Sequence, residues 1–209
     1  GSEPNLTTAM KSVGEAMSIG RTIHESMQKA LASMEQGLTG FDEISIPGAS
    51  DPASGRAAIV KALSQQTPDR LRVIAQAMRE GLEDDEIQSI TKFDPWFLSR
   101  IREIIEAEQD VESNGLPTDA TGLRHLKMMG FTDARMAMLS GQSEAAVRKA
   151  RTNAGVTAVF KRIDTCAAEF EAQTPYMYST YENPVFGEVE CEARPTDRKK
   201  VVILGGGPN

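Results

Sequence analysis

Apolar residues recur at intervals of three and four through most of the chain between positions 22 and 153, with polar residues between them. This spacing is typical of helices that bury one face. The first stretch predicts a helix over residues 23–36, because Thr22 and Glu25 have the spacing of a capping box and Gly37 follows the last apolar position. A mainly α-helical fold is therefore expected.

Three polar residues followed by proline predict the starts of the next helices, since a small polar cap and a proline in the first turn both suit a helix N-terminus. These pairs are Asp51-Pro52, Thr67-Pro68 and Asp94-Pro95. The helix after Asp94 is long and is expected to end near Ser113, before Asn114-Gly115. Further apolar stretches predict helices near residues 119–129, 132–140 and 143–153.

Two segments of the helical region match at an offset of 49 residues, one starting at Gly81 and the other at Gly130. Apolar positions align with apolar positions, and the predicted caps of the second helices, Asp94 and Ser143, also coincide. The match predicts a short helix, a turn and a second helix used twice. The alternative is a chance alignment of two amphipathic helices, which helical periodicity alone produces easily.

Two stretches lack this period. Glycine and proline are frequent in residues 37–55, which indicates a linker between two units. Residues 157–200 contain all three tyrosines and several turn signals, as in extended chain that packs across another surface. The stretch Val201–Leu204 then predicts a short buried strand. After it comes a glycine-rich turn of the kind that leads from a strand to a helix in nucleotide-binding folds, formed by Gly205, Gly206, Gly207, Pro208 and Asn209.

Composition narrows the functions open to the chain. The 209 residues carry a net charge of −7, with an isoelectric point near 5.0, which disfavours general binding to nucleic acid. Two cysteines and two histidines lack the spacing of a zinc site or a disulfide framework. Because the chain has no apolar run of about 18 residues and no signal peptide pattern, we expect no membrane association and a cytoplasmic location.

A helix-turn-helix is itself a possible function, because its second helix can read the major groove of DNA. Residues 131–162 hold six basic residues against Asp133 and Glu144, so this copy of the repeat is locally positive. Its second helix would present Glu144, Ala145 and Arg148 to the groove. The first copy is acidic in its first turn, however, and phosphate would repel it. DNA binding is therefore kept as the alternative to a structural role.

No other candidate for catalysis stands out in residues 37–160, where the sequence shows no paired carboxylates, Ser/His/Asp set or metal cluster. His125 lies among leucines and predicts a structural histidine. Cys166 has acidic neighbours and no histidine, unlike a catalytic thiolate. Trp96 and Phe97 predict core anchors, whereas an exposed Trp96 would mark a protein interface. The helical region is thus expected to be a scaffold.

Several motifs carry a family resemblance. The segments KRIDTCAAEF, PYMYSTYE and DRKKVVILGGGPN, in this order, resemble the central part of the large subunit of carbamoyl-phosphate synthetase. The segment MKSVGEAMSIGR is similar to the end of that subunit's first ATP-grasp half, and GFTDARMAMLSG and FDPWFLSRI resemble its helical middle domain. The loop NPVFGEVECEARP is longer than the common form of that loop, which leaves its conformation open.

The resemblance implies a helical bundle of orthogonal helix pairs with a helix-turn-helix-like repeat, flanked by extended segments from the neighbouring ATP-grasp halves. Gly1 and Ser2 match the remnant of an expression tag. The other boundaries implied are 3–36 for the tail of the first half, 37–160 for a helical oligomerisation domain, 161–200 for a connecting segment, and 201–209 for the first strand and glycine loop of the second half.

The resemblance also implies the activity of the whole enzyme. That enzyme is a ligase that makes carbamoyl phosphate from bicarbonate, glutamine-derived ammonia and two ATP, with Mg²⁺ or Mn²⁺, for arginine and pyrimidine biosynthesis. The expected partners of this chain are the rest of the large subunit, the glutaminase small subunit and further copies that bind through the helical domain. No catalytic residue, metal ligand or cofactor is expected within the chain, so alone it should be inactive.

Two groups of site residues follow from the resemblance. Met10 and Glu15 would line the passage that carries carbamate between the two active sites. The loop Gly205–Asn209 is expected not to bind phosphate here, because a phosphate loop needs the N-terminus of a following helix. Residues 3–22 and 201–209 are expected to be disordered or to make non-native contacts, since they lack the sheets they would join.

Overall fold

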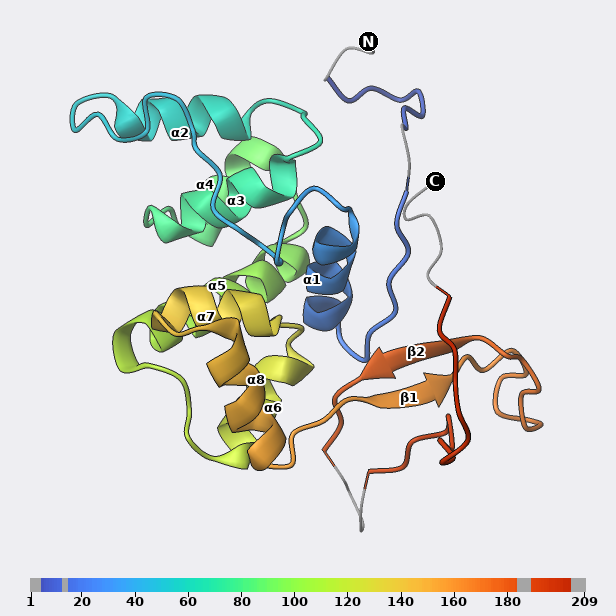
Figure 1. Ribbon diagram of the computed structural model, residues 1–209. Helices are drawn as coiled ribbons and strands as arrows, with labels where there is room; N and C mark the ends of the chain where they lie inside the picture. Colours follow the sequence, from blue (N-terminus) through green and yellow to red (C-terminus); the bar gives the residue numbers. More distant parts are fainter. Residues whose placement is uncertain (1–4, 13–14, 184–188, 204–209) are drawn as a thin grey trace. The chain divides into compact units, whose positions relative to one another are not determined.

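The computed structural model describes residues 5–12, 15–183 and 189–203 (Figure 1). In these ranges the chain forms eight helices and one two-stranded sheet, so the expected mainly α fold is confirmed. The helices are α1 (Ile23–Ser33), α2 (Gly55–Leu63), α3 (Arg70–Arg79), α4 (Asp84–Thr91), α5 (Pro95–Asn114), α6 (Ala120–Met128), α7 (Asp133–Ser140) and α8 (Glu144–Asn153). The strands are β1 (Val159–Arg162) and β2 (Met177–Thr180).

The chain consists of two compact units. The first contains Gly1–Glu15 and Phe41–Asp110, and the second contains Ala16–Gly40 and Val111–Asn209. One boundary, between Gly40 and Phe41, falls inside the stretch that predicts a linker. Phe41 is nevertheless fully buried, so the stretch is packed against the first unit from its first residue there.

Helices α2, α3 and α4 and most of α5 make up the first unit, in which α2 packs against α3 and α4. Their buried side chains form its core, among them Ile59, Ile74, Met78, Ile87, Leu98 and Ile104. An ion pair joins α3 to α5, because Nη2 of Arg79 lies 2.6 Å from Oε2 of Glu108 and also donates to the carbonyl of Phe41. Since Glu108 is buried, its charge depends on Arg79 for compensation.

Two predicted helix starts are wrong by two or three residues. Helix α2 begins at Gly55 rather than at Asp51-Pro52, because the Asp51 carboxylate accepts a hydrogen bond from the Ala53 N–H within a turn (2.8 Å). That hydrogen bond is the main cause of the lowered pKa of Asp51. Helix α3 likewise begins after a turn that includes Pro68, at Arg70. The proline pairs therefore mark the turns before these helices.

Two other predicted caps are confirmed. The Asp94 carboxylate accepts a hydrogen bond from the Trp96 N–H at the start of α5 (2.8 Å). At the start of α1, the Thr22 hydroxyl accepts one from the Glu25 N–H (3.3 Å). The Glu25 carboxylate accepts one from the Arg21 N–H (2.7 Å), one residue before the donor of an ordinary capping box. Helix α1 ends three residues earlier than predicted.

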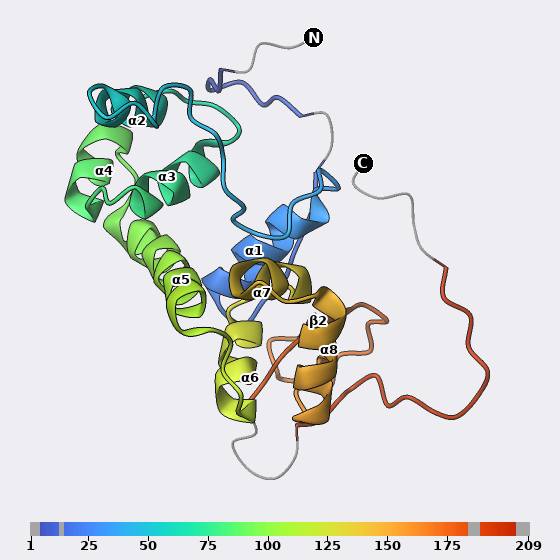
Figure 2. The same ribbon diagram turned by 60° about the vertical axis from the view of Figure 1, so that its left-hand side comes forward.

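The second unit joins α1, α6, α7 and α8 to the β1–β2 hairpin, and α1 lies against the turn between α6 and α7 (Figure 2). The Gln28 side chain donates to the carbonyl of Met129 in that turn (3.0 Å). A Cβ placed on Gly130 would lie only 2.9 Å from the Cα of Glu25. Because such a distance is a steric clash, the turn needs a glycine where α1 crosses it.

The stretch predicted to be extended contains the hairpin. Its strands are antiparallel, with Val159 opposite Thr180. The Thr180 hydroxyl is buried and donates to the Glu25 carboxylate (3.2 Å), and the Lys29 ammonium donates to the carbonyl of Ser179. The prediction that this stretch packs across another surface is confirmed, and the surface is α1.

The strand that the apolar run predicts near the C-terminal end is not formed by the residues that the structure describes there. Val201, Val202 and Ile203 form no strand and are 80–90% exposed. A strand needs a neighbour that takes up its backbone hydrogen bonds, and no segment in the described ranges pairs with these residues. Leu204 and the loop Gly205–Asn209 lie outside the described residues.

Candidate functional site

The predicted repeat is confirmed at the level of helix boundaries. Helices α4 and α7 begin at Asp84 and Asp133, and α5 and α8 begin at Pro95 and Glu144, so both pairs of starts are 49 residues apart. The ends of α3 and α6 are separated by the same interval. The repeating motif is therefore three helices long, one helix more than the sequence match indicated. Each unit contains one copy.

The turn after the first helix is built alike in both copies. Gly81 and Gly130 have left-handed backbone, with φ of 83° and 91°. The next residue, Leu82 in one copy and Phe131 in the other, is buried, and its N–H donates to a carbonyl in the last turn of the preceding helix at 3.0 and 3.2 Å. A left-handed glycine followed by an apolar residue is a common way to end a helix. This explains why the glycines and the apolar residues align.

A salt bridge also repeats. In the first copy, Nη2 of Arg102 lies 2.6 Å from Oδ1 of Asp84. In the second, Nη2 of Arg151 lies 2.8 Å from Oδ2 of Asp133. Each pair ties the third helix of its copy to the first residue of the second helix. The sequence match contains all four residues, but only the structure shows that they are partners.

The second copy adds a buried lysine to this arrangement. Lys127 takes the place of Met78 in the first copy, and its Nζ donates to Oδ1 of Asp133 (2.9 Å) and to the carbonyl of Phe131 (2.6 Å). Burial lowers the pKa of Lys127 despite these bonds. Burial alone would raise the pKa of Asp133, but hydrogen bonds from Arg151 and Lys127 outweigh it and lower that pKa. These charges hold the second copy together.

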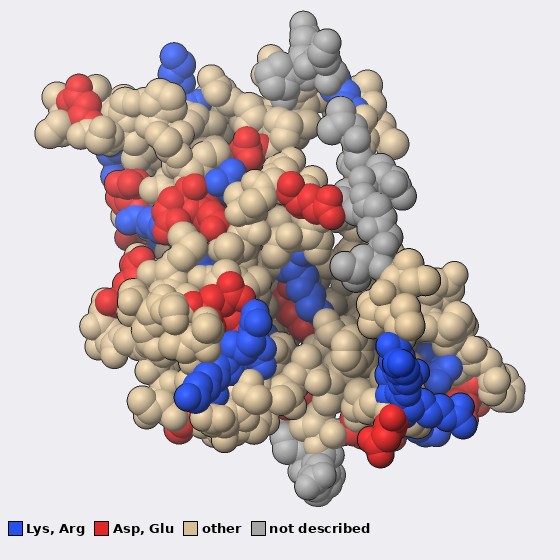
Figure 3. All heavy atoms as spheres, viewed as in Figure 1, with Lys and Arg blue, Asp and Glu red and all other residues tan. Residues whose placement is uncertain are grey.

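Internal contacts engage arginines that suggested DNA binding. Arg135 is buried, Arg151 pairs with Asp133, and Arg148 pairs with Glu144 (2.6 Å). Figure 3 shows Lys and Arg gathered over α8 in the second unit and Asp and Glu gathered over α4 in the first. Because the arginines are paired within their own unit and α4 is acidic, the structure gives the helix-turn-helix alternative no support.

The copies differ at the start of the third helix. Trp96 and Phe97 in the first turn of α5 are 52% and 42% exposed, so the prediction that they are core anchors is wrong. The aligned residues of α8 are Ala145 and Ala146, which are also exposed. The buried residue of this turn is the next one, Leu98. The contrast between two aromatic residues and two alanines was a signal already present in the sequence match.

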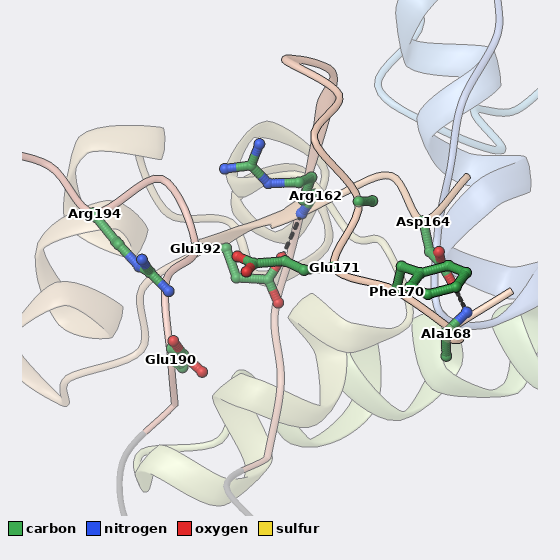
Figure 4. A pocket seen from close by; sticks show the side chains of 9 residues that line it. Arg162, Asp164, Ala168, Phe170, Glu171, Glu190, Glu192 and Arg194 are labelled. Carbon is green, nitrogen blue, oxygen red and sulfur yellow. Dashed lines mark hydrogen bonds between the residues drawn. The ribbon is translucent and has the colours of Figure 1, made fainter. Parts of the chain in front are cut away.

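A cavity of about 330 Å³ lies beside the hairpin in the second unit (Figure 4). Among the described residues, four acidic and two basic ones contribute to its lining: Asp164, Glu171, Glu190, Glu192, Arg162 and Arg194. The figure shows Arg162 and Glu192 between Asp164 on one side and Arg194 on the other. Because acidic groups outnumber basic ones, the lining disfavours an anionic ligand.

Hydrogen bonds between side chains and backbone set the walls of this cavity. Ala167 and Ala168 both have positive φ, 52° and 60°, which side-chain-bearing residues rarely adopt. The Asp164 carboxylate holds this loop by accepting the Ala168 N–H (2.8 Å). Opposite it, the Arg162 N–H donates to the Glu192 carboxylate (2.6 Å), which is the main cause of the lowered pKa of Glu192.

The residues expected from the resemblance to serve a site are not brought together. Met10 and Glu15 are exposed on irregular chain, and neither lines the cavity beside the hairpin, so their role in a carbamate passage stays a prediction. Within residues 5–12, 15–183 and 189–203, no group of three or more His, Cys, Asp or Glu side chains is placed to hold a metal ion. Over the same ranges, no helix is long and apolar enough to cross a membrane.

These features define a class of protein: a helical scaffold made of two three-helix copies, with charges that are used for internal ion pairs and with an exposed aromatic pair. Comparison with known sequences then gives the family. The chain belongs to the family described as carbamoyl-phosphate synthetase large chain, oligomerisation domain, whose model matches residues 15–155. The resemblance seen in the sequence motifs is thereby confirmed.

Curated relatives share this description. The carbamoyl phosphate synthase large chain of Rhizobium meliloti is 56% identical over 209 residues, which cover 100% of this chain and 18% of the relative. The large chain of Brucella melitensis is equally similar, with 56% identity and the same coverage. That of Neisseria meningitidis serogroup A is 48% identical over 208 residues, covering 99% and 18%. The chain thus spans less than a fifth of the length of these relatives.

Proposed function

We propose that this chain is the non-catalytic centre of a carbamoyl phosphate synthase large chain, and that its helical region binds a second copy of itself. One observation carries the proposal: the match to the oligomerisation domain, residues 15–155, covers both three-helix copies together with α1 and α2. The conspicuous charges of those copies serve internal ion pairs. Side chains that are already paired with one another suit a scaffold that binds another protein better than they suit a catalytic site.

The buried ion pairs support an interface role. The pair between Arg79 and Glu108 joins α3 to α5, and the contacts of Asp133 with Lys127 and Arg151 join the three helices of the second copy. Breaking such a pair is costly, so each unit is held in one arrangement. A rigid surface loses little conformational entropy when it binds, which favours association.

The proposal extends to the enzyme around this chain. The rest of the large chain would carry two ATP-grasp halves that bind ATP with Mg²⁺ or Mn²⁺. Together with a glutaminase small subunit, it would make carbamoyl phosphate from bicarbonate and ammonia for arginine and pyrimidine biosynthesis in the cytoplasm. Met10 and Glu15 would border the carbamate passage when those halves are present.

The cavity beside the hairpin fits a structural role within this proposal. Bicarbonate, carbamate and ATP are anions, and the lining of the cavity has more carboxylates than guanidinium groups. Its strained loop is held by Asp164 through its own backbone contacts. The chain would therefore contribute shape and assembly, while catalysis takes place on the ATP-grasp halves.

Self-association of the 209-residue chain in solution tests the proposal. We expect its molar mass, measured by light scattering after size-exclusion chromatography, to rise with protein concentration to that of a dimer or a larger assembly. A molar mass equal to that of one chain at every concentration would contradict the self-binding role.

A further inference from the structure

The start of α5 carries an aromatic pair that faces solvent. The ring centroids of Trp96 and Phe97 are 5.0 Å apart, and their planes are inclined by 86°, an edge-to-face arrangement. The Arg100 guanidinium carbon lies 5.8 Å from the centroid of the Trp96 ring. Arg100 in turn pairs with Glu103 one turn further on (2.7 Å). We call these four residues the α5 patch.

The second copy of the motif shows that the fold does not require the aromatic pair. Helix α8 begins at the position aligned with the start of α5 and has Ala145 and Ala146 where α5 has Trp96 and Phe97. In both copies the following residue is the buried one. The two alanines show that such a helix start can form without aromatic side chains, and about half of each aromatic side chain at α5 is left exposed.

The α5 patch also stands out within the region that matches the oligomerisation domain. Among the described residues of 15–155, four large apolar side chains are exposed: Met17, Trp96, Phe97 and Met138. Of these four, only Trp96 and Phe97 are adjacent, and their rings are in edge-to-face contact. Tryptophan and arginine are enriched among the residues that dominate binding energy at protein interfaces. An exposed tryptophan beside an arginine is therefore a feature expected on the binding surface of an oligomerisation domain.

We propose that Trp96 and Phe97 are the anchors of the contact between two copies of this chain, which meet about a twofold axis. This inference rests on the proposed function and names the surface for it. The occupant is a second copy because the family match describes residues 15–155 as an oligomerisation domain. The patch also carries one charge of each sign, Arg100 and Glu103, and a surface that meets its own copy about a twofold axis can use both.

The double substitution Trp96→Ala with Phe97→Ala tests this contact. It gives α5 the residues that α8 has at the aligned positions, so the helix should still form, and far-ultraviolet circular dichroism checks this. We expect the dimer dissociation constant of the full 209-residue chain, measured by light scattering, to rise at least about tenfold. The matched control is Met138→Ala, which removes an exposed apolar side chain from α7 and should leave the dissociation constant unchanged.

Fluorescence gives an independent measurement, because Trp96 is the only tryptophan in the sequence. In the unsubstituted chain, acrylamide quenching of Trp96 should weaken as the concentration rises through the range in which the copies associate. If the chain associates while Trp96 stays equally quenchable and the double variant associates equally well, the inference fails and the proposed function stands. If the chain is a monomer at every concentration, both fail.

Discussion

Asp133 shows how one carboxylate can determine the stability of a whole copy. Its two oxygens accept hydrogen bonds from Lys127 on α6 and Arg151 on α8, while Asp133 itself starts α7. Asp84, at the aligned position in the first copy, pairs with Arg102 and has no lysine beside it among the described residues of its copy. The difference arises because a lysine in one copy replaces a methionine, Met78, in the other.

This comparison predicts two unequal substitutions. Asp133→Ala would leave Lys127 buried without its carboxylate and should lower the free energy of unfolding by about 3–5 kcal/mol. Lys127→Met copies the aligned Met78 and keeps the pair between Asp133 and Arg151, so it should cost less than about 1.5 kcal/mol. Urea unfolding of both variants measures the difference. Equal costs would contradict the claim that an unpaired buried lysine causes the larger loss.

The lowered pKa of Asp133 gives this cluster a pH dependence. A carboxyl group whose pKa is lower in the folded state stabilises the fold fully above its unfolded value, and this contribution disappears as the pH falls through the lowered pKa. The difference in free energy of unfolding between the natural chain and Asp133→Asn should therefore be largest near neutral pH. It should shrink between about pH 5 and pH 2. A difference that stays constant over this range would contradict the assigned shift.

At the scale of elements, the turn after the first helix of each copy offers a matched pair of glycines. Both Gly81 and Gly130 have left-handed backbone. At such a position, replacing glycine with alanine lowers the free energy of unfolding by about 1 kcal/mol. A Cβ on Gly81 would meet no atom within 4 Å, whereas one on Gly130 would lie 2.9 Å from the Cα of Glu25 in α1. Gly130→Ala should therefore lower the melting temperature clearly more than Gly81→Ala, as measured by calorimetry. Equal shifts in melting temperature would mean that α1 moves aside at little cost to make room for the added methyl group.

Helices were the elements that the sequence predicted best. Helices α5 to α8 lie within about one residue of their expected bounds, because caps such as Asp94 and Ser143 and the stops at Gly115 and Gly141 act locally. Starts preceded by a turn were less predictable. Asp51 binds the backbone of a turn as readily as that of a helix, so its side chain alone does not fix where α2 begins.

The candidate site was less predictable than the fold, because it depends on contacts between distant residues. Whether Trp96 is exposed depends on which face of α5 is buried. The spacing of apolar residues in the sequence allowed either Trp96 or Leu98 to be the core residue of this turn. The pairing of Asp133 with Lys127 and Arg151 requires three helices to be placed in space. The family, by contrast, was recognisable from short motifs such as KRIDTCAAEF, which need no tertiary information.

At the scale of the whole molecule, the chain folds into two units and spans a small share of the length of its relatives. It matches the relatives over its full length and covers 18% of theirs. Each unit has its own copy of the motif and its own buried ion pairs. If the proposed function is right, the chain should assemble by itself, because the ion pairs that stabilise its units and the exposed α5 patch both lie within its 209 residues.

The molar mass of the 209-residue chain in solution tests the central claim most directly. Light scattering over a wide range of concentrations should show a rise from the mass of one chain, 22.7 kDa, toward about twice that value or more. The claim that this is a self-associating domain would be contradicted by a mass that stays at 22.7 kDa up to the highest concentration at which the protein remains in solution.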